Sequence, residues 1–143
     1  MKILWTDGSA EPNPGKGGFA VLEQVEGKVV PVVLGHENPS TNIRMEGSAI
    51  IAVIKYAGVE GCEIHTDSQF WVNVLTKWAP SWARRGWRKQ GGEIKNLEMV
   101  KEAYRLYSKY PVELCWVRGH ANIDFNEAAD AWANKAREGA TIE

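Results

Sequence analysis

The sequence predicts an α/β fold built on a five-stranded mixed sheet, with three antiparallel strands followed by parallel crossovers and flanking helices. Up to Leu34 the chain carries short Val- and Leu-rich segments between turn residues, which indicates antiparallel strands. Beyond Leu34, helical periodicities alternate with two further short apolar segments, as in strand-helix crossovers. The chain has 143 residues, of which 44% are hydrophobic, and we expect residues 1–143 to form a single domain.

The N-terminal part predicts three antiparallel strands. An apolar strand at Lys2–Thr6 leads into a stretch through Gly18 that is dense in turn-forming residues. Two Val-rich strands follow at Phe19–Gln24 and Lys28–Leu34, and Glu26-Gly27 between them suits a hairpin turn.

The middle of the chain predicts a long helix and a fourth strand. Apolar residues recur with helical spacing over about Arg44–Ala57, and Ser40-Thr41-Asn42 offers N-cap residues just before them. Gly58 and Gly61 end this helix. Glu63–Thr66 then has the length and composition of a short strand.

The second half predicts further helices and the last strand. An apolar stripe with helical spacing runs from Trp71 to Trp78, and we expect Pro80 and Gly86 to interrupt that helix. The remaining predicted elements are a helix around Leu97–Tyr107, a fifth strand at Val112–Val117 and a C-terminal helix around Phe125–Ala136.

Composition excludes several classes of protein. No apolar run reaches the roughly 18 residues of a membrane helix, and Asp7 precedes any signal-peptide core, so we expect a cytoplasmic monomer with no membrane partner. Cys62 and Cys115 lack the close spacing of a zinc or redox motif. We therefore expect two reduced structural thiols and no metal bound by sulfur. No motif surrounds His36 or His65.

Charge is distributed unevenly along the chain. The net charge is -1, yet residues 68–92 contain no Asp or Glu. Within this stretch a basic segment, residues 77–92, combines cations with tryptophans: Lys77, Arg84, Arg85, Arg88 and Lys89 with Trp78, Trp82 and Trp87. Cations beside flat rings suit a sugar-phosphate backbone, and three Trp exposed to water would be unfavourable without a ligand. The alternative is a solvated amphipathic helix.

Four acidic residues are candidates for a metal site. Asp7 and Asp67 each follow a predicted strand, so their carboxylates would emerge close together if those strands are neighbours. Glu46 lies early in the first long helix, and Asp130 lies in the last one. Clustered carboxylates repel one another and need protons or cations, and all-oxygen ligands favour Mg²⁺. Each acid taken alone could equally be a helix cap or a surface residue.

Five short motifs occur in order along the chain: Thr6-Asp7-Gly8-Ser9 with Asn13-Pro14-Gly15, Arg44-Met45-Glu46, Thr66-Asp67-Ser68-Gln69, Val117-Arg118-Gly119-His120, and Asn126-Glu127 ahead of Asp130. Together they resemble ribonuclease H type 1, over nearly the whole chain. That family's basic protrusion, called the handle, matches residues 77–92. The resemblance implies the mixed sheet expected above and endonucleolytic cleavage of the RNA strand of an RNA/DNA hybrid.

The resemblance also implies an active site. The family's metal-binding carboxylates fall on Asp7, Glu46, Asp67 and Asp130, and its loop histidine falls on His120. These residues would support two-metal hydrolysis with two Mg²⁺ ions, for which Mn²⁺ is an expected substitute. His120 would move protons, and the products would carry 5′-phosphate and 3′-hydroxyl ends.

Substrate contacts follow from the same resemblance. Asn13, Asn42 and Gln69 would lie along the RNA strand, Thr41 and Asn96 would hold a DNA phosphate, Trp78 would pack on deoxyribose, and Arg84, Arg85, Arg88 and Lys89 would bind backbone without sequence preference. Asn13 and Asn42 could instead serve only a turn and a helix cap. Ile43 stands where relatives often carry a polar residue.

Two other functions compete with hybrid cleavage. A binding module could keep the fold and the handle and bind hybrids without cutting them, although the complete acid set weighs against this. A structural domain would leave both the acids and the basic segment without a purpose.

Overall fold

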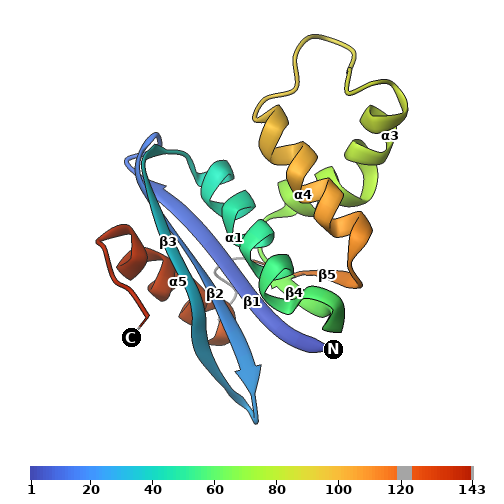
Figure 1. Ribbon diagram of the computed structural model, residues 1–143. Helices are drawn as coiled ribbons and strands as arrows, with labels where there is room; N and C mark the ends of the chain where they lie inside the picture. Colours follow the sequence, from blue (N-terminus) through green and yellow to red (C-terminus); the bar gives the residue numbers. More distant parts are fainter. Residues whose placement is uncertain (119–123, 143) are drawn as a thin grey trace.

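The computed structural model describes residues 1–118 and 124–142. A single sheet runs in the order β3-β2-β1-β4-β5 (Figure 1). Its strands are β1 (Lys2–Glu11), β2 (Gly15–Val25), β3 (Lys28–Ser40), β4 (Cys62–Thr66) and β5 (Val112–Trp116). The first three strands are antiparallel, whereas β4 joins β1 and β5 joins β4 in parallel. The predicted fold class is therefore confirmed.

The first three strands are longer than predicted, and the extension of β1 places Asp7 differently. Asp7 does not end β1, because it pairs with Ala20 of β2 and the ladder continues to Glu11. The glycines of this region are strand residues that let helices approach closely. A Cβ on Gly8 would lie 2.5 Å from the backbone nitrogen of Glu46, and one on Gly18 would collide with the C-terminal helix.

Helices cover both faces of the sheet. They are α1 (Asn42–Ala57), α2 (Gln69–Asn73), α3 (Ala79–Arg84), α4 (Leu97–Lys109) and α5 (Asp124–Arg137), with a 3-10 turn at Gly58–Glu60. One face of the sheet carries α1, which packs in turn on α4 (Figure 1). The opposite face carries α5, which contacts β1, β2 and β3. Within residues 1–118 and 124–142, α5 does not pack on β4 or β5 to a comparable extent.

The first helix begins where its cap was predicted. The Thr41 hydroxyl accepts a hydrogen bond from the Arg44 N–H at 3.1 Å, which satisfies one of the free donors of the first turn. Trp71 is completely buried, and its indole N–H donates to the Ile43 carbonyl at 2.8 Å. This bond ties α2 to the start of α1.

Pro80 does not interrupt the second helical segment, contrary to the expectation. The chain stays helical from Gln69 to Arg84 because a π-helical turn, Val74–Trp78, joins α2 to α3. Pro80 then lies at the start of α3, directly after the π-helical turn. The first part of the handle is therefore helical, through Arg84.

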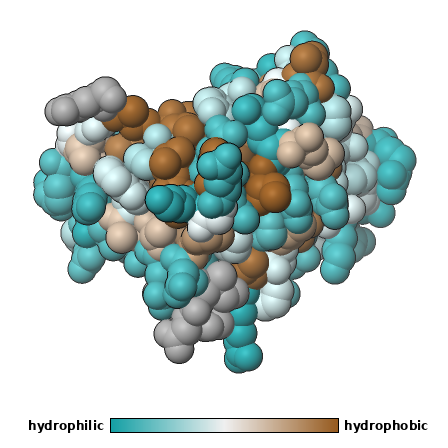
Figure 2. All heavy atoms as spheres, turned by 90° about the horizontal axis from the view of Figure 1, so that it is seen from below, coloured by the Kyte–Doolittle hydropathy of each residue, from teal (hydrophilic) through white to brown (hydrophobic). Residues whose placement is uncertain are grey.

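Two apolar clusters fill the space between the layers. The larger lies between the sheet and α1, α2 and α4, and includes Trp71 and Ile50. The smaller lies under α5, around Trp5 and Ala133. Apolar residues at the surface form several separate groups among hydrophilic ones in the view of Figure 2. In residues 1–118 and 124–142 no helix combines the length and the apolar composition needed to cross a bilayer.

Candidate active site

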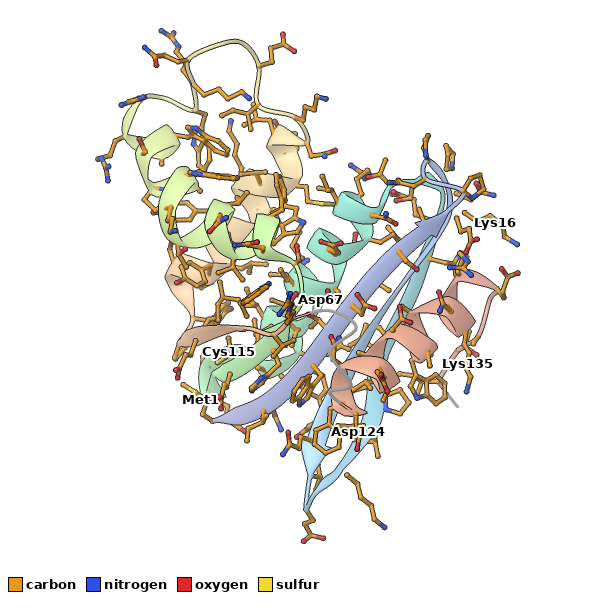
Figure 3. The ribbon with its side chains drawn as sticks, turned by 180° about the vertical axis from the view of Figure 1, so that it is seen from behind. Met1, Lys16, Asp67, Cys115, Asp124 and Lys135 are labelled. Carbon is orange, nitrogen blue, oxygen red and sulfur yellow. The ribbon has the colours of Figure 1, made fainter. Side chains whose placement is uncertain are left out.

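Asp7 and Asp67 emerge at the same end of a parallel strand pair, as the sequence predicted. The β1–β4 register ends with Thr6 opposite Thr66, and an aspartate follows each of these two residues along the chain. Asp67 lies where β4 gives way to α2 (Figure 3). Asp7 is only 7% exposed, because β2 still pairs beside it and α5 covers this face.

The two helices that pack on opposite faces bring the other two acids. Glu46 belongs to α1, whose backbone rests directly against Gly8, the residue after Asp7. Asp130 belongs to α5, and a Cβ on Gly18 would lie 2.5 Å from the carbonyl oxygen of Ala133 in that helix. Each acid therefore comes near Asp7 because a glycine permits close approach of its helix to the sheet.

The electrostatics join these acids into one group. Burial, the charge of Asp67, and the hydrogen bond and charge of Asp130 together raise the pKa of Asp7 from 3.8 to about 9, with burial as the largest cause. Burial also raises the pKa of Glu46 to about 7, with a smaller contribution from Asp67, while a hydrogen bond from Ser68 opposes it. The arrangement retains a proton on Asp7 at neutral pH and suits cations that would replace it.

The residues fit a hard divalent ion by their donor set. All four acids offer oxygen ligands, two of them are held largely out of water, and Mg²⁺ is held by a few carboxylates with water and phosphate. They are not drawn together to coordination distance. In the part of the chain that the structure describes, one group of three potential ligand atoms lies within 4.8 Å of one another, and it contains none of these four acids.

Ser68 is a site residue that sequence reasoning missed. It caps α2 by accepting a hydrogen bond from the Trp71 N–H at 3.2 Å, and it also hydrogen-bonds to Glu46. Its place directly after Asp67 in a recognisable motif was the available signal. His120, the predicted proton carrier, lies outside the described residues.

An apolar groove of about 470 Å³ brings together three of the predicted substrate contacts. Trp78, Lys89 and Asn96 line it, from the π-helical turn, the handle and the start of α4. Trp78 is 40% exposed and meets Phe70 edge-on at 6.0 Å between ring centroids. Phe70 and Ile94 also line the groove, and no sequence motif pointed to them.

Polar residues at the start of α1 form a hydrogen-bonded chain. The Asn42 side-chain oxygen accepts from the Ala10 N–H at 2.7 Å, and the Asn13 side-chain oxygen accepts from the Asn42 N–H at 3.1 Å. Asn13 lies in the turn between β1 and β2, as its alternative role required, whereas Asn42 does not cap the helix because Thr41 does. Arg44 donates to the Asn96 side-chain oxygen at 3.4 Å, which links two predicted substrate residues, Thr41 and Asn96, through a residue that was not predicted.

The handle differs from expectation in its tryptophans. The four basic residues Arg84, Arg85, Arg88 and Lys89 are all exposed, as is Gln69 at the start of α2. Of the three handle tryptophans, however, only Trp78 is exposed. Trp82 and Trp87 pack against the larger core cluster, and Trp87 meets Tyr104 of α4 edge-on at 5.9 Å. Their burial anchors the handle to the domain and leaves its cations free to face outward.

Comparison with known proteins identifies the family. The ribonuclease H family model matches residues 1–138. A ribonuclease H from Bordetella pertussis is 40% identical over 140 residues, which cover 96% of this chain and 89% of that protein. One from Acidiphilium cryptum is 38% identical over 138 residues, with 94% and 85% covered.

Solved structures agree. LC9-RNase H1, described as a type 1 RNase H with the type 2 active-site motif, has a TM-score of 0.77 at 28% identity, covering 99% of this chain and 74% of that one. RNase H1 from Halobacterium salinarum has a TM-score of 0.69 at 25% identity, with 97% and 98% covered. The resemblance carried by the five motifs is thus confirmed, and the chain belongs to the ribonuclease H family.

Proposed function

We propose that this chain is an endonuclease that hydrolyses the RNA strand of RNA/DNA hybrids with two divalent ions, leaving 5′-phosphate and 3′-hydroxyl ends. The observation that carries the proposal is the electrostatic coupling of Asp7 to Asp67 and Asp130 in a largely buried setting. LC11-RNase H1, which shares the fold at a TM-score of 0.70 and 20% identity, has been solved in complex with an RNA/DNA hybrid.

Four carboxylates would hold the ions. Asp7 is central because it interacts with two of the other acids, so it suits the position between two ions. Glu46 and Asp67 interact with each other and would complete one ion's ligands, and Asp130 would serve the other. When bound, a pair of Mg²⁺ or Mn²⁺ ions supplies an activated water and stabilises the leaving 3′ oxygen.

Two other residues would control protons at the site. Ser68 donates to Glu46, and that hydrogen bond favours the ionised carboxylate over the protonated one. His120 would accept and release protons near neutral pH, as an imidazole can.

Hybrid binding would use the groove and the handle. Trp78, 40% exposed in the groove, would pack on the deoxyribose of the DNA strand, and Thr41 with Asn96 would hold a DNA phosphate. Asn13, Asn42 and Gln69 would face the RNA strand, where side-chain amides can recognise 2′-hydroxyls. The exposed handle cations Arg84, Arg85, Arg88 and Lys89 would add affinity that does not depend on sequence.

The test is cleavage by the Asp67→Asn variant. We expect wild-type protein with Mg²⁺ to cut the RNA of a labelled hybrid, to leave duplex RNA and duplex DNA intact, and to stop when EDTA is added. Asp67→Asn should abolish cleavage and retain hybrid binding, because it removes a ligand charge without removing volume. Asp124→Asn is the matched control, since Asp124 is an exposed residue at the start of α5.

Two results would overturn the proposal in different ways. Turnover that survives in Asp67→Asn would remove this acid from the site. Wild-type protein that binds the hybrid but leaves its RNA uncut would establish the competing function, a binding module without catalysis.

A further inference from the structure

A second cluster of ligating side chains lies on the sheet beside the region that α5 covers. Glu63 and His65 are two residues apart on β4 and therefore share a face. Cys115 of β5 is the direct register partner of His65 (Figure 3). Because α5 packs on β1, β2 and β3, all three side chains keep partial exposure.

The distances in this trio are close to those around a tetrahedral metal ion. The Glu63 Oε1 atom lies 3.2 Å from the His65 Nε2 atom and accepts from the Cys115 thiol at 3.4 Å. All three potential ligand atoms lie within 4.8 Å of one another. Zinc bonds of about 2.0–2.3 Å at tetrahedral angles separate neighbouring ligand atoms by roughly 3.3–3.7 Å. An ion could therefore enter with small side-chain adjustments.

The surroundings hold the ligands in place and leave room for water. The His65 ring stacks on Trp5, with centroids 4.3 Å apart and planes 17° from parallel, while both strands are fixed by the sheet. The side chains of His65 and Glu63 are 19% and 33% exposed, so solvent reaches the trio. Glu113 is close enough to Cys115 to act on it electrostatically, which adds negative charge beside the site.

The donor types decide which ion fits. One sulfur, one imidazole nitrogen and one carboxylate oxygen suit a borderline ion such as Zn²⁺, whereas Mg²⁺ prefers oxygen ligands throughout. We propose that Glu63, His65 and Cys115 form a binding site for Zn²⁺ or a similar divalent transition metal, with water as the fourth ligand. The alternative is that these three residues form a hydrogen-bonded surface trio that binds no metal.

This proposal departs from the expectation drawn from cysteine spacing. We expected no metal bound by sulfur because Cys62 and Cys115 lack the close spacing of a zinc or redox motif. Cys62 is buried between the layers, and both cysteines are free thiols. The parallel register of β4 and β5 brings together ligands that are 50 positions apart in the sequence, so the spacing of nearby residues does not indicate the site.

The experiment uses Co²⁺ as a spectroscopic probe and the full chain. After EDTA treatment and desalting, we expect one equivalent of Co²⁺ to produce a thiolate-to-cobalt charge-transfer band, which only sulfur ligation gives. Zn²⁺ should abolish the band by displacement, and excess Mg²⁺ should not. The band should be lost in Cys115→Ser and His65→Ala.

Two matched variants test whether the other thiol or another histidine contributes to the band. Cys62→Ala and His36→Ala, the latter at an exposed position of β3, should retain the band. Circular dichroism confirms that each variant is folded. Absence of the band in wild-type protein, its persistence in Cys115→Ser, or its displacement by Mg²⁺ would each overturn the proposal. None of these readouts depends on nuclease activity, so failure here leaves the proposed cleavage function untouched.

Discussion

Replacing Asp7 with Asn should stabilise the metal-free protein at neutral pH. Burial and the neighbouring acids Asp67 and Asp130 raise the pKa of the Asp7 carboxyl from 3.8 to about 9. Between these values the folded protein keeps a proton that the unfolded chain has released, so the free energy of unfolding falls as the pH rises. The contribution of Asp7 to stability is full below about pH 4 and is lost as the pH rises towards 9.

The magnitude follows from the same linkage. Each pH unit over which only the folded state holds the proton lowers stability by about 1.4 kcal/mol. At pH 7 roughly three such units have been crossed, which sets a ceiling of about 4 kcal/mol. Asn carries no charge, keeps an N–H donor toward Asp130 and keeps an acceptor for the Gly8 N–H. Allowing for side-chain rearrangement in the wild type, we expect a gain of about 2–4 kcal/mol at pH 7 and about 1–2 kcal/mol at pH 5.

Urea unfolding in the presence of EDTA at pH 5, 7 and 9 measures this gain. Glu26→Gln, in the exposed turn between β2 and β3, is the control and should change stability by less than about 0.5 kcal/mol. Adding Mg²⁺ should narrow the gap between wild type and Asp7→Asn, because ions that bind only the folded wild-type site stabilise it. A gap that stays constant from pH 5 to pH 9, or a destabilised variant, would refute the reasoning.

Two further changes test the scaffold and the handle. Gly18→Ala should lower the free energy of unfolding by about 1–3 kcal/mol or more and reduce hybrid cleavage, because the new Cβ would meet the backbone of α5. Urea unfolding measures the stability and a turnover assay measures the cleavage, and unchanged stability would contradict the close packing. Replacing Arg84, Arg85, Arg88 and Lys89 with Ala should weaken hybrid binding and flatten the log-log salt dependence by about 0.9 per lost phosphate contact, whereas an unchanged slope would mean that the handle does not touch the backbone.

Much of the fold was predictable from local patterns. The helix expected over Arg44–Ala57 starts two residues earlier, at Asn42, and the Thr41 cap is among the three residues proposed for it. The placement of Asp7 and Asp67 at one end of neighbouring strands was a conditional prediction, and the parallel β1–β4 pairing fulfils its condition. Apolar periodicity and capping residues are enough for the helix because it depends on near neighbours in the sequence, whereas the meeting of Asp7 and Asp67 required the pairing of two distant strands.

The features that sequence reasoning missed depend on contacts between distant segments. Pro80 is tolerated because a π-helical turn precedes it, which residue preferences do not indicate. Trp82 and Trp87 were expected to be exposed because cations surround them, but they pack toward the core that α4 helps to build. The ligand trio beside α5 likewise exists only through the register of β4 and β5.

The glycines of β1 and β2 supply the part of the acid cluster that local sequence patterns do not indicate. Gly8 and Gly18 suggest turns when each is considered with its neighbours, yet both are paired strand residues. Each removes the Cβ that would keep a helix away, Gly8 from α1 and Gly18 from α5. Close approach of both helices is what brings Glu46 and Asp130 near Asp7 of β1, where repulsion among the acids disfavours the metal-free site. The packing that stabilises the layers therefore maintains an arrangement that its own charges oppose, and bound cations would remove that opposition.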